Sequence, residues 1–436
     1  MKVELTDAMK LEISRFTKKD KVSAIKEHIE TTFSCRISYS SIYNEFRRQN
    51  PRFGPMDCKN FLDFLDRNQA LKEYETSENK DLCKLLFVTE KMKANFSKFG
   101  DILILDSTYN TNTYSVPLVV FSGIDNNYKN VLFAIGFVND ESKATYSWLF
   151  NRFKTLNGMP SLVMTDQDLA IGAALQETES WQDIPHRLCS WHIGRNLRKY
   201  FKFIKADHDE IKEKIFKLPY QNDKTTFELH EKEISKFLKD FDLKKSLDYF
   251  ENLLQSKEKW ARPYHLPYFD ADVTTTSRAE SWNRYIKRYV GSKSELSDII
   301  EFIQNTDKTC LNFEGNLTSD VLIFIETDPL VAELKGYLSP KLYEKQLEQY
   351  SLAKRCESKL VMDKDEQIYE VIYVKSESQP IASQKIHKVT LRQRISCSCS
   401  YFKRVGLICF HIFHICAIKN IKTIAKLPLL KDGGVL

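Results

Sequence analysis

The sequence contains no long apolar run and no strong excess of one sign of charge. Residues 1–7 lack the apolar core of a signal peptide, and no run approaches the roughly 18 apolar residues of a membrane span. We therefore expect a protein of the cytosol or nucleus that makes no membrane contact. The net charge of +6 suits a polyanionic partner, but Lys and Arg are so mixed with Asp and Glu that charge alone is weak support.

Composition also excludes a disordered chain and a disulfide framework. With 436 residues, of which 42% are hydrophobic and 12% aromatic, the chain can bury more than one core, so two or three domains are expected. Ten cysteines in a reducing compartment are not read as disulfides. Six of them are scattered and are expected to be small buried apolar residues: Cys35, Cys58, Cys83, Cys310, Cys356 and Cys416.

Three acidic residues stand at positions that suit a metal-dependent phosphodiester enzyme. Asp106 closes the apolar run 102–105, Asp166 closes the run 162–165, and Glu280 opens a helix-like stretch. Carboxylates placed in this way can hold two divalent cations about 3.5 to 4 Å apart, which is the arrangement used in phosphoryl transfer. Taken singly, each acid is more often a turn former or a helix N-cap.

The order of predicted elements around these acids raises the odds of a shared site. Residues 115–124 and 131–138 are short β-branched and aromatic runs that predict two strands after the Asp106 strand. Apolar residues at helical spacing then predict a helix over 144–156, followed by the Asp166 strand and a helix over 169–178. Three strands, a helix, a strand and a helix is the order of a ribonuclease-H-like α/β domain.

Local motifs are similar to those of a known family. They are Leu105–Tyr109 with Thr111, Asn112, Pro117 and Leu118 nearby, Thr165–Asp168, Cys189–His192 with Asn196, and Thr274–Asn283. Together they resemble the Mutator-like element (MULE) transposases and the plant far-red-impaired-response regulators derived from them. The resemblance covers roughly residues 80 to 300. It implies that Asp106, Asp166 and Glu280 are the catalytic acidic triad, which binds two Mg²⁺ or Mn²⁺ ions.

What the resemblance implies for function is a DDE transposase. Such an enzyme binds transposon ends on double-stranded DNA, cleaves them and joins them to target DNA, and we expect it to be nuclear and homo-oligomeric on DNA. Two alternatives stay open. A domesticated DNA-binding transcriptional regulator would keep the fold but would not need the acids, and a ribonuclease or resolvase of the same fold would use them on another substrate.

A second motif, near the C-terminus, has the spacing of a zinc site. Cys397 and Cys399 are followed after nine residues by Cys409 and His411, and two such pairs can converge on one structural zinc ion. The spacing resembles that of a SWIM-type zinc finger. Alternating strands over 368–374 and 389–395 predict a ββα form for residues 366–425. The neighbouring His414 and Cys416 are expected to pack or to lie at the surface.

Cys189 and His192 form only half of a zinc site, because no second pair lies nearby in the sequence. In the transposases that this chain resembles, the motif sits beside the catalytic acids and is thought to order the active site or the DNA strands. Packing at a strand-to-helix junction is an equally good interpretation. Both residues are therefore secondary site candidates.

The remaining segments are predicted to be helical. Residues 193–275 have helical spacing and no strand pattern, which predicts an all-helical insertion in a catalytic domain that spans 81–300. Residues 1–80 show three apolar stripes that fit a helix-turn-helix DNA-binding arrangement, although any small helical bundle has such stripes. A helical connector is expected over 301–365.

Overall fold

The computed structural model divides the chain into two compact units. Unit 1 comprises residues 1–125, 130–193 and 275–312, and unit 2 comprises residues 126–129, 194–274 and 313–436. The structure describes residues 5–16, 20–49, 55–78, 81–108, 116–202, 204, 208–265, 268–276, 280–282, 286, 299–300, 302–304, 328–363, 367–374, 386–391 and 395–423. Motif residues 109, 111, 112, 277–279 and 283, and connector residues 305–327, lie outside these ranges.

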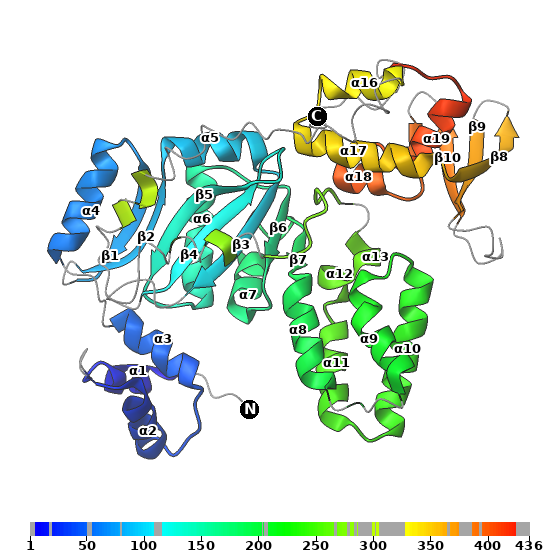
Figure 1. Cartoon of the computed structure of the whole chain (residues 1–436). Coiled ribbons are helices and arrows are strands. Elements are labelled where there is room, and N and C mark those ends of the chain that lie inside the picture. Colours follow the sequence, from blue (N-terminus) through cyan, green and yellow to red (C-terminus); the bar gives the residue numbers. More distant parts are fainter. Residues whose placement is uncertain are drawn as a thin grey trace. The chain divides into compact units, whose positions relative to one another are not determined.

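Unit 1 begins with three short helices that share a small core. They are α1 (Asp7–Ile13), α2 (Val22–Thr32) and α3 (Tyr39–Gln49). Thr6 caps α1, because its hydroxyl accepts the amide N–H of Met9 at 3.3 Å. The residues of the predicted apolar stripes meet inside the bundle, where Ile13, Ile25 and Phe46 are fully buried. The three helices expected in this region are confirmed (Figure 1).

A seven-stranded mixed sheet forms the centre of unit 1 (Figure 1). Its strand order is β1-β2-β5-β4-β3-β6-β7, and only the pairs β3–β6 and β6–β7 are parallel. The strands are β1 (Leu71–Thr76), β2 (Leu82–Val88), β3 (Ile102–Thr108), β4 (Leu118–Ile124), β5 (Asn130–Val138), β6 (Leu162–Thr165) and β7 (His186–Leu188). Every residue of β4 and β6 is buried, as expected for strands covered on both faces.

Four helices complete the core around the sheet. They are α4 (Pro55–Arg67), α5 (Glu90–Phe99), α6 (Lys143–Leu156) and α7 (Leu169–Glu177). Phe153 of α6 stacks on Phe121 of β4, with ring centroids 4.9 Å apart, and meets Phe96 of α5 edge-on at 5.2 Å. Such aromatic pairs stabilise a core beyond the area they bury. The predicted strands and helices between residues 102 and 178 are confirmed.

The N-terminal region was expected to be helical through residue 80, and this expectation is wrong at its end. Residues 71–76 form β1, the edge strand of the sheet, paired with β2. The strand LKEYET has no buried residue, shows no regular alternation of burial and has little apolar content. Its state is decided by the neighbouring strand rather than by its own pattern.

The described part of residues 194–274 in unit 2 contains helices and turns but no strand, as predicted. The helices are α8 (Ser190–Phe201, which begins in unit 1), α9 (Asp209–Lys217), α10 (Lys224–Asp240), α11 (Lys244–Leu254), α12 (Lys257–Trp260) and α13 (Arg262–His265), with a 3-10 turn at Leu218–Tyr220. Phe227, Ile234 and Phe250 are fully buried. Trp260 is also buried, and its indole N–H donates to the carbonyl of Leu253 at 2.9 Å.

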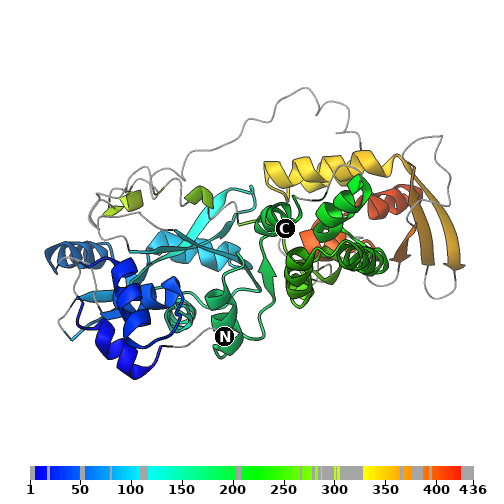
Figure 2. The same ribbon diagram turned by 90° about the horizontal axis from the view of Figure 1, so that it is seen from below.

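The C-terminal part of unit 2 is a small α/β structure. Its helices are α16 (Pro329–Lys335), α17 (Pro340–Ala353), α18 (Tyr401–Val405) and α19 (Phe410–Ile418). Its antiparallel sheet has the order β11-β10-β9-β8, with β8 (Cys356–Asp363), β9 (Gln367–Tyr373), β10 (Ile386–Leu391) and β11 (Ile395–Cys397). The strands lie beside α19 in both views (Figure 1, Figure 2).

Two expectations for this region need correction. The connector was expected to be helical through residue 365, but its last residues form β8. The finger was expected to contain two strands before its helix, whereas the sheet has four. The predicted strand 389–395 is divided between β10 and β11. These two strands pair with each other, with Val389 opposite Cys397 and Leu391 opposite Ile395.

A buried ion pair joins the two parts of unit 2. The Arg404 guanidinium donates to Asp270 at 3.1 Å and to Asp272 at 2.7 Å, and Arg404 and Asp270 are 4% and 1% exposed. The carbonyl of Arg404 also accepts the amide N–H of Asp270 at 2.8 Å. Because both charges are removed from water, each depends on the other for solvation.

We predict that Arg404→Ala destabilises unit 2 by about 3–5 kcal/mol, because the substitution leaves a buried carboxylate without its counter-charge. Lys341→Ala breaks only an exposed ion pair to Glu344 on α17 and should change stability by about 0.5 kcal/mol or less. Urea unfolding followed by hydrogen exchange of peptides from α17 and α19 measures both effects. Equal effects of the two substitutions would contradict this account of the ion pair.

Candidate functional site

The two aspartates that the sequence singled out lie near the C-terminal ends of the parallel strands β3 and β6. Their register pairs Ile102 with Leu162 and Ile104 with Met164. Extended by two residues, it sets Asp106 opposite Asp166. Asp106 lies in β3 and is 8% exposed, and Asp166 follows β6 directly. Both carboxylates therefore belong to the same edge of the sheet.

The neighbouring strand β7 brings Cys189 to this edge. Thr165 pairs with Leu188, and the amide N–H of Cys189 donates to the carbonyl of Thr165 at 2.8 Å. Cys189 is fully buried and is followed by α8, whose first turn carries His192. The Cys-x-x-His motif thus lies at a strand-to-helix junction next to the Asp166 strand.

Glu280 reaches the same junction from far along the chain. Residues 280–282 are helical, and the amide N–H of Glu280 donates to the carbonyl of Thr276 at 3.0 Å. One carboxylate oxygen, Oε1, lies 3.7 Å from Nε2 of His192. The amide N–H of Thr276 donates to the sulfur of Cys189 at 3.2 Å, and the Thr276 hydroxyl lies 3.4 Å from Nδ1 of His192.

Hydrogen bonds and charges within this group of residues shift the pKa values of Cys189 and His192. Hydrogen bonding to the Cys189 side chain raises the pKa of His192 more than any other interaction, burial opposes the rise, and the charges of Asp166 and Glu280 add to it. For Cys189, burial acts to raise the pKa, but hydrogen bonds from His192 and Thr276 outweigh burial and lower it. The pKa of the Cys189 thiol is therefore lowered and the pKa of the His192 imidazole is raised by the same contact.

A fourth carboxylate, Glu141, belongs to this neighbourhood and was missed in the sequence. It lies between β5 and α6, and its Oε1 accepts a hydrogen bond from the hydroxyl of Tyr146 at 3.3 Å. Burial, together with the negative charges of Asp168 and Asp166, raises the pKa of Glu141 to about 7, against an opposing hydrogen bond from Ser107. In the sequence Glu141 is recognisable only as an acid that precedes the helix N-cap Ser142, so no local pattern predicts that it lies near the other acids.

Carboxylate oxygens, such as those at this edge of the sheet, are the protein ligands that Mg²⁺ prefers. Among the described residues, however, these acids form no group of three ligand atoms within 4.8 Å of one another. The Oε1 atom of Glu280 is buried without a hydrogen-bond partner and lies 3.7 Å from Nε2 of His192. The crowding of acids that raises the pKa of Glu141 would be relieved by a cation.

The second predicted site is assembled at the end of β11 and the start of α19. Cys397 ends β11, Cys399 lies in the following turn, Cys409 caps α19, and His411 lies in its first turn. Their ligand atoms all lie within 4.8 Å of one another. Among the described residues, this is the one group of three or more Cys, His, Asp or Glu side chains that meets so closely.

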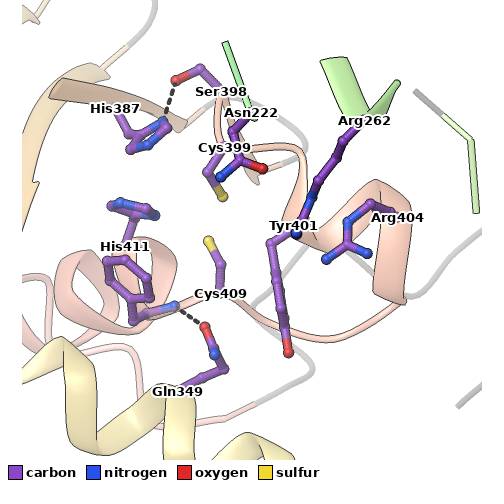
Figure 3. Close-up of a pocket in the computed structure, with 11 residues that line it drawn as sticks. Asn222, Arg262, Gln349, His387, Ser398, Cys399, Tyr401, Arg404, Cys409 and His411 are labelled. Atoms are coloured by element: carbon purple, nitrogen blue, oxygen red, sulfur yellow. Dashed lines mark hydrogen bonds between the residues drawn. The ribbon is translucent and has the colours of Figure 1, made fainter. Parts of the chain in front are cut away.

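The surroundings of these four side chains fit a metal ion. The sulfurs of Cys399 and Cys409 point toward each other, with the ring of His411 alongside (Figure 3). His411 is 2% exposed, and its Nδ1 atom is buried without a hydrogen-bond partner. The set Cys₃His could therefore bind a metal ion such as zinc. A cavity of about 330 Å³ opens beside it and is also lined by Tyr401, Arg404 and Arg262 (Figure 3).

The protonation of the three thiols is uneven. Hydrogen bonds from Cys397 and Cys409 lower the pKa of Cys399, whereas burial raises the pKa of Cys409. Because zinc binds cysteine as the thiolate, metal binding must release the protons that these thiols carry. The nearby His414 points elsewhere, because its ring nitrogens lie 3.2 Å from the Ala353 carbonyl and 3.2 Å from the Ser358 hydroxyl.

Comparison with known proteins agrees with this arrangement. Residues 102–196 match the MULE transposase domain. The resemblance to that family, and to its far-red-impaired-response relatives, is confirmed. The matched segment runs from β3 through Asp106, Asp166, Cys189 and His192 into α8.

Curated relatives come from Arabidopsis thaliana. The chain is 24% identical over 410 residues to Protein FAR1-RELATED SEQUENCE 5, which covers 87% of this chain and 51% of that protein. It is 23% identical over 379 residues to Protein FAR1-RELATED SEQUENCE 11, with coverage of 82% and 53%. It is 24% identical over 228 residues to Protein FAR-RED IMPAIRED RESPONSE 1, with coverage of 52% and 27%. The chain spans about half the length of the first two relatives.

No helix among the described residues is both long and apolar enough to cross a membrane.

We predict that Cys399→Ser and His411→Ala each lower the zinc content of the purified protein, because a structural site needs all four ligands. They should also expose residues 385–420 to protease while unit 1 stays protected. His414→Asn is the matched control, three residues along the same helix, and should leave the zinc content unchanged. Elemental analysis by mass spectrometry measures the stoichiometry, and unchanged zinc in both ligand variants would reject this ligand set.

Glu141 predicts a pH dependence of stability. Its pKa in the folded protein, about 7, lies above its ordinary value of 4.5. It therefore contributes stability that is present below about pH 4.5 and is lost as the pH rises through 7. In EDTA, Glu141→Gln should raise the unfolding midpoint at pH 8, and its advantage should shrink toward pH 5. The exposed control Glu90→Gln should show no such trend. A Glu141→Gln curve parallel to that of the wild type would contradict the prediction.

Proposed function

We propose that this chain is a DDE transposase whose catalytic domain has a ribonuclease-H-like fold. The strand order β5-β4-β3-β6-β7 supports the fold, because an antiparallel meander is followed by two parallel strands that are reached through helices. This is the order of elements that the sequence predicted for such a domain. The helices of residues 194–274 would then be an insertion before the segment that carries Glu280.

The catalytic acids are proposed to be Asp106, Asp166 and Glu280. The observation that carries this proposal is the β3–β6 register, which sets Asp106 opposite Asp166 at one buried edge, with Glu280 beside the adjoining β7–α8 junction. Asp168, by contrast, is accounted for as the N-cap of α7, since its carboxylate accepts the amide N–H groups of Ala170 and Ile171.

In the proposed mechanism the carboxylates of Asp106, Asp166 and Glu280 would together hold two divalent cations. Two Mg²⁺ or Mn²⁺ ions held there would activate a water or a 3′-hydroxyl and stabilise charge on the departing 3′-oxygen. Glu141, neutral below about pH 7, would leave the three acids as the charged ligands. Hydrolysis would free the element end, and attack by that end on target DNA would insert it.

The remaining parts of the chain would bind zinc or DNA and would take no part in the chemical steps. We propose that one structural zinc is held by Cys397, Cys399, Cys409 and His411 in a SWIM-type finger. The exposed basic residues Arg195, Arg198, Lys199 and Lys202 of α8 and the segment after it would contact DNA phosphates. The N-terminal helices would act as a helix-turn-helix DNA-binding domain, and the protein would work in the nucleus as a homo-oligomer on DNA.

A second candidate is a domesticated DNA-binding regulator. It is favoured by the similarity to the FAR1-related proteins, which extends over 87% of this chain. A regulator needs binding alone, so selection would not need to retain the acids. Retention of all three acids supports the enzyme.

The prediction that separates the two concerns Asp106. With Mg²⁺ or Mn²⁺, the wild-type protein should nick a labelled duplex at the boundary of the element's terminal repeat. Asp106→Asn should lower this rate by at least about 100-fold, because bound metal contributes several kcal/mol to such transition states. DNA binding should be retained and should weaken steeply with salt in both proteins.

Asp101→Asn is the matched control, since Asp101 lies just before the opposite end of β3, and it should cut like the wild type. Tight, sequence-specific binding without a metal-dependent nick on authentic element ends would favour the regulator. Equal cleavage by wild type and Asp106→Asn would remove the catalytic assignment.

A further inference from the structure

The cavity beside the Cys₃His set lies between segments of unit 2 that are distant in the sequence. Its volume is about 330 Å³, which is within the range of about 300–1,000 Å³ that small-ligand sites occupy. Asn222 and Arg262 line it from the helical part of the unit, and Gln349 lines it from α17. The wall is completed by β10, by the turn after β11 and by α19. The proposed catalytic acids belong to unit 1, so this cavity is a separate site.

Aromatic rings gather on one side of the cavity. The ring centroids of Phe410 and His411 are 3.9 Å apart, and those of His387 and His411 are 4.5 Å apart. All three residues line the cavity, and Figure 3 shows His387 and His411 on the same side of it. Rings of Phe and His are among the surfaces on which unpaired nucleobases stack.

Carboxamide and hydroxyl groups accompany these rings. The carboxamide of Gln349 is held in place, because its Oε1 accepts the amide N–H of Phe410 at 3.1 Å. The Ser398 hydroxyl lies 3.4 Å from Nδ1 of His387, and Asn222 adds an exposed carboxamide. Because a carboxamide carries both donors and an acceptor, the lining matches the mixed hydrogen-bonding edge of a nucleobase better than it matches an apolar ligand.

The opposite side of the cavity is positively charged. Arg262 and Arg404 lie there (Figure 3). Arg404 pairs with Asp270 and Asp272, and Nζ of Lys345 lies 3.5 Å from Asp272. Against burial, which acts to raise it, the hydrogen bond and charge of Arg404 and the charges of Lys345 and Arg262 lower the pKa of Asp272. Three cations therefore surround two carboxylates, and a guanidinium is well suited to bind a phosphate.

From this arrangement we propose that the cavity binds one unpaired nucleotide, with its base against the rings of His387 and Phe410 and its phosphate at Arg262. The inference goes beyond the proposed catalysis and requires none of the acids. A zinc ion in the Cys₃His set would reinforce this orientation, because three thiolates outweigh the charge of one zinc ion and the metal side would repel a phosphate. A nucleotide within a strand and a free mononucleotide share this chemistry, and the experiment distinguishes them.

The test measures DNA binding by the zinc-loaded full chain without added Mg²⁺ or Mn²⁺, so that no strand is cut. Fluorescence anisotropy compares a fully paired duplex with the same duplex carrying one unpaired nucleotide. His387→Ala and Arg262→Gln should each raise Kd for the second probe about tenfold, and Kd for the first by less than about twofold, because each removes a contact to the unpaired nucleotide alone. His387→Phe keeps a ring and should restore most of the affinity. Lys217→Gln removes an exposed cation of α9 and should match the wild type with both probes.

An abasic residue at the unpaired position tests the base itself. The wild type should bind the abasic probe about tenfold more weakly than the intact one, and His387→Ala should have no further effect on it. Free deoxynucleoside monophosphate identifies the source of the ligand. Competition as strong as that of the unpaired probe assigns a mononucleotide, and weaker competition assigns a nucleotide held within a strand.

Two outcomes would overturn the proposal. One is equal affinity of the wild type for the intact and abasic probes, and the other is wild-type Kd values in both His387→Ala and Arg262→Gln. Zinc content is measured for every variant. If His387→Ala loses zinc or does not fold, Arg262→Gln and Asn222→Ala, whose side chain is exposed, decide the question. Absence of a metal-dependent nick by the wild type would refute the proposed catalysis and leave the nucleotide site unaffected, so the two failures are distinguishable.

Discussion

The parallel pairing of β3 with β6 is the contact on which the acidic site depends. Both strands are buried on both faces, and Leu103, Leu105 and Val163 have no exposed surface. A slip of the pairing by one residue would turn these side chains to the opposite faces and break the core. The burial that stabilises unit 1 therefore also fixes the register that sets Asp106 opposite Asp166. Precision in the site is a consequence of packing in the sheet.

The acidic edge is unfavourable when considered alone. Asp106 is nearly buried, Glu141 is held with a pKa near 7, and a buried oxygen of Glu280 lacks a hydrogen-bond partner. Each of these features costs stability that the large aromatic and aliphatic core of unit 1 must offset. Unfavourable groups of this kind, within an otherwise favourable fold, are expected at sites of binding or chemistry. A divalent cation would replace the repulsion between these carboxylates by attraction to the ion.

The four-stranded sheet of unit 2 covers a smaller core than the sheet of unit 1. That core includes Cys409 and Cys416 among its buried residues, so the packing of α19 also helps to position the Cys₃His set. A bound metal would add folding free energy to a module of limited apolar content. The Arg404 ion pair with Asp270 and Asp272 then ties this module to the segment that follows the helices of the same unit. Arg404 and the four Cys₃His residues all lie in the short span 397–411.

Sequence periodicity was sufficient for elements whose burial follows a simple rule. The buried strands at 102–105 and 162–165, the amphipathic helix at 144–156 and the helices after 193 could all be predicted, because one or both faces of each meet a core. The grouping of Cys397, Cys399, Cys409 and His411 could also be predicted from their paired spacing, because such ligands lie close together in the sequence. The edge strand β1 and the strand β8 could not be predicted, because their state depends on the strands beside them.

For the acidic site, the sequence pattern was enough to place Asp106 and Asp166 after two buried apolar runs, and the family motifs predicted that Glu280 accompanies them. The side chains that gather around those acids could be found only from the packing of the folded chain. Glu141 approaches Asp166 because α6 begins beside the sheet edge, and Thr276 meets Cys189 because the chain returns after a long helical segment. Contacts between residues so far apart leave no trace in local periodicity, since they arise from how separate elements pack and not from the pattern within any one of them.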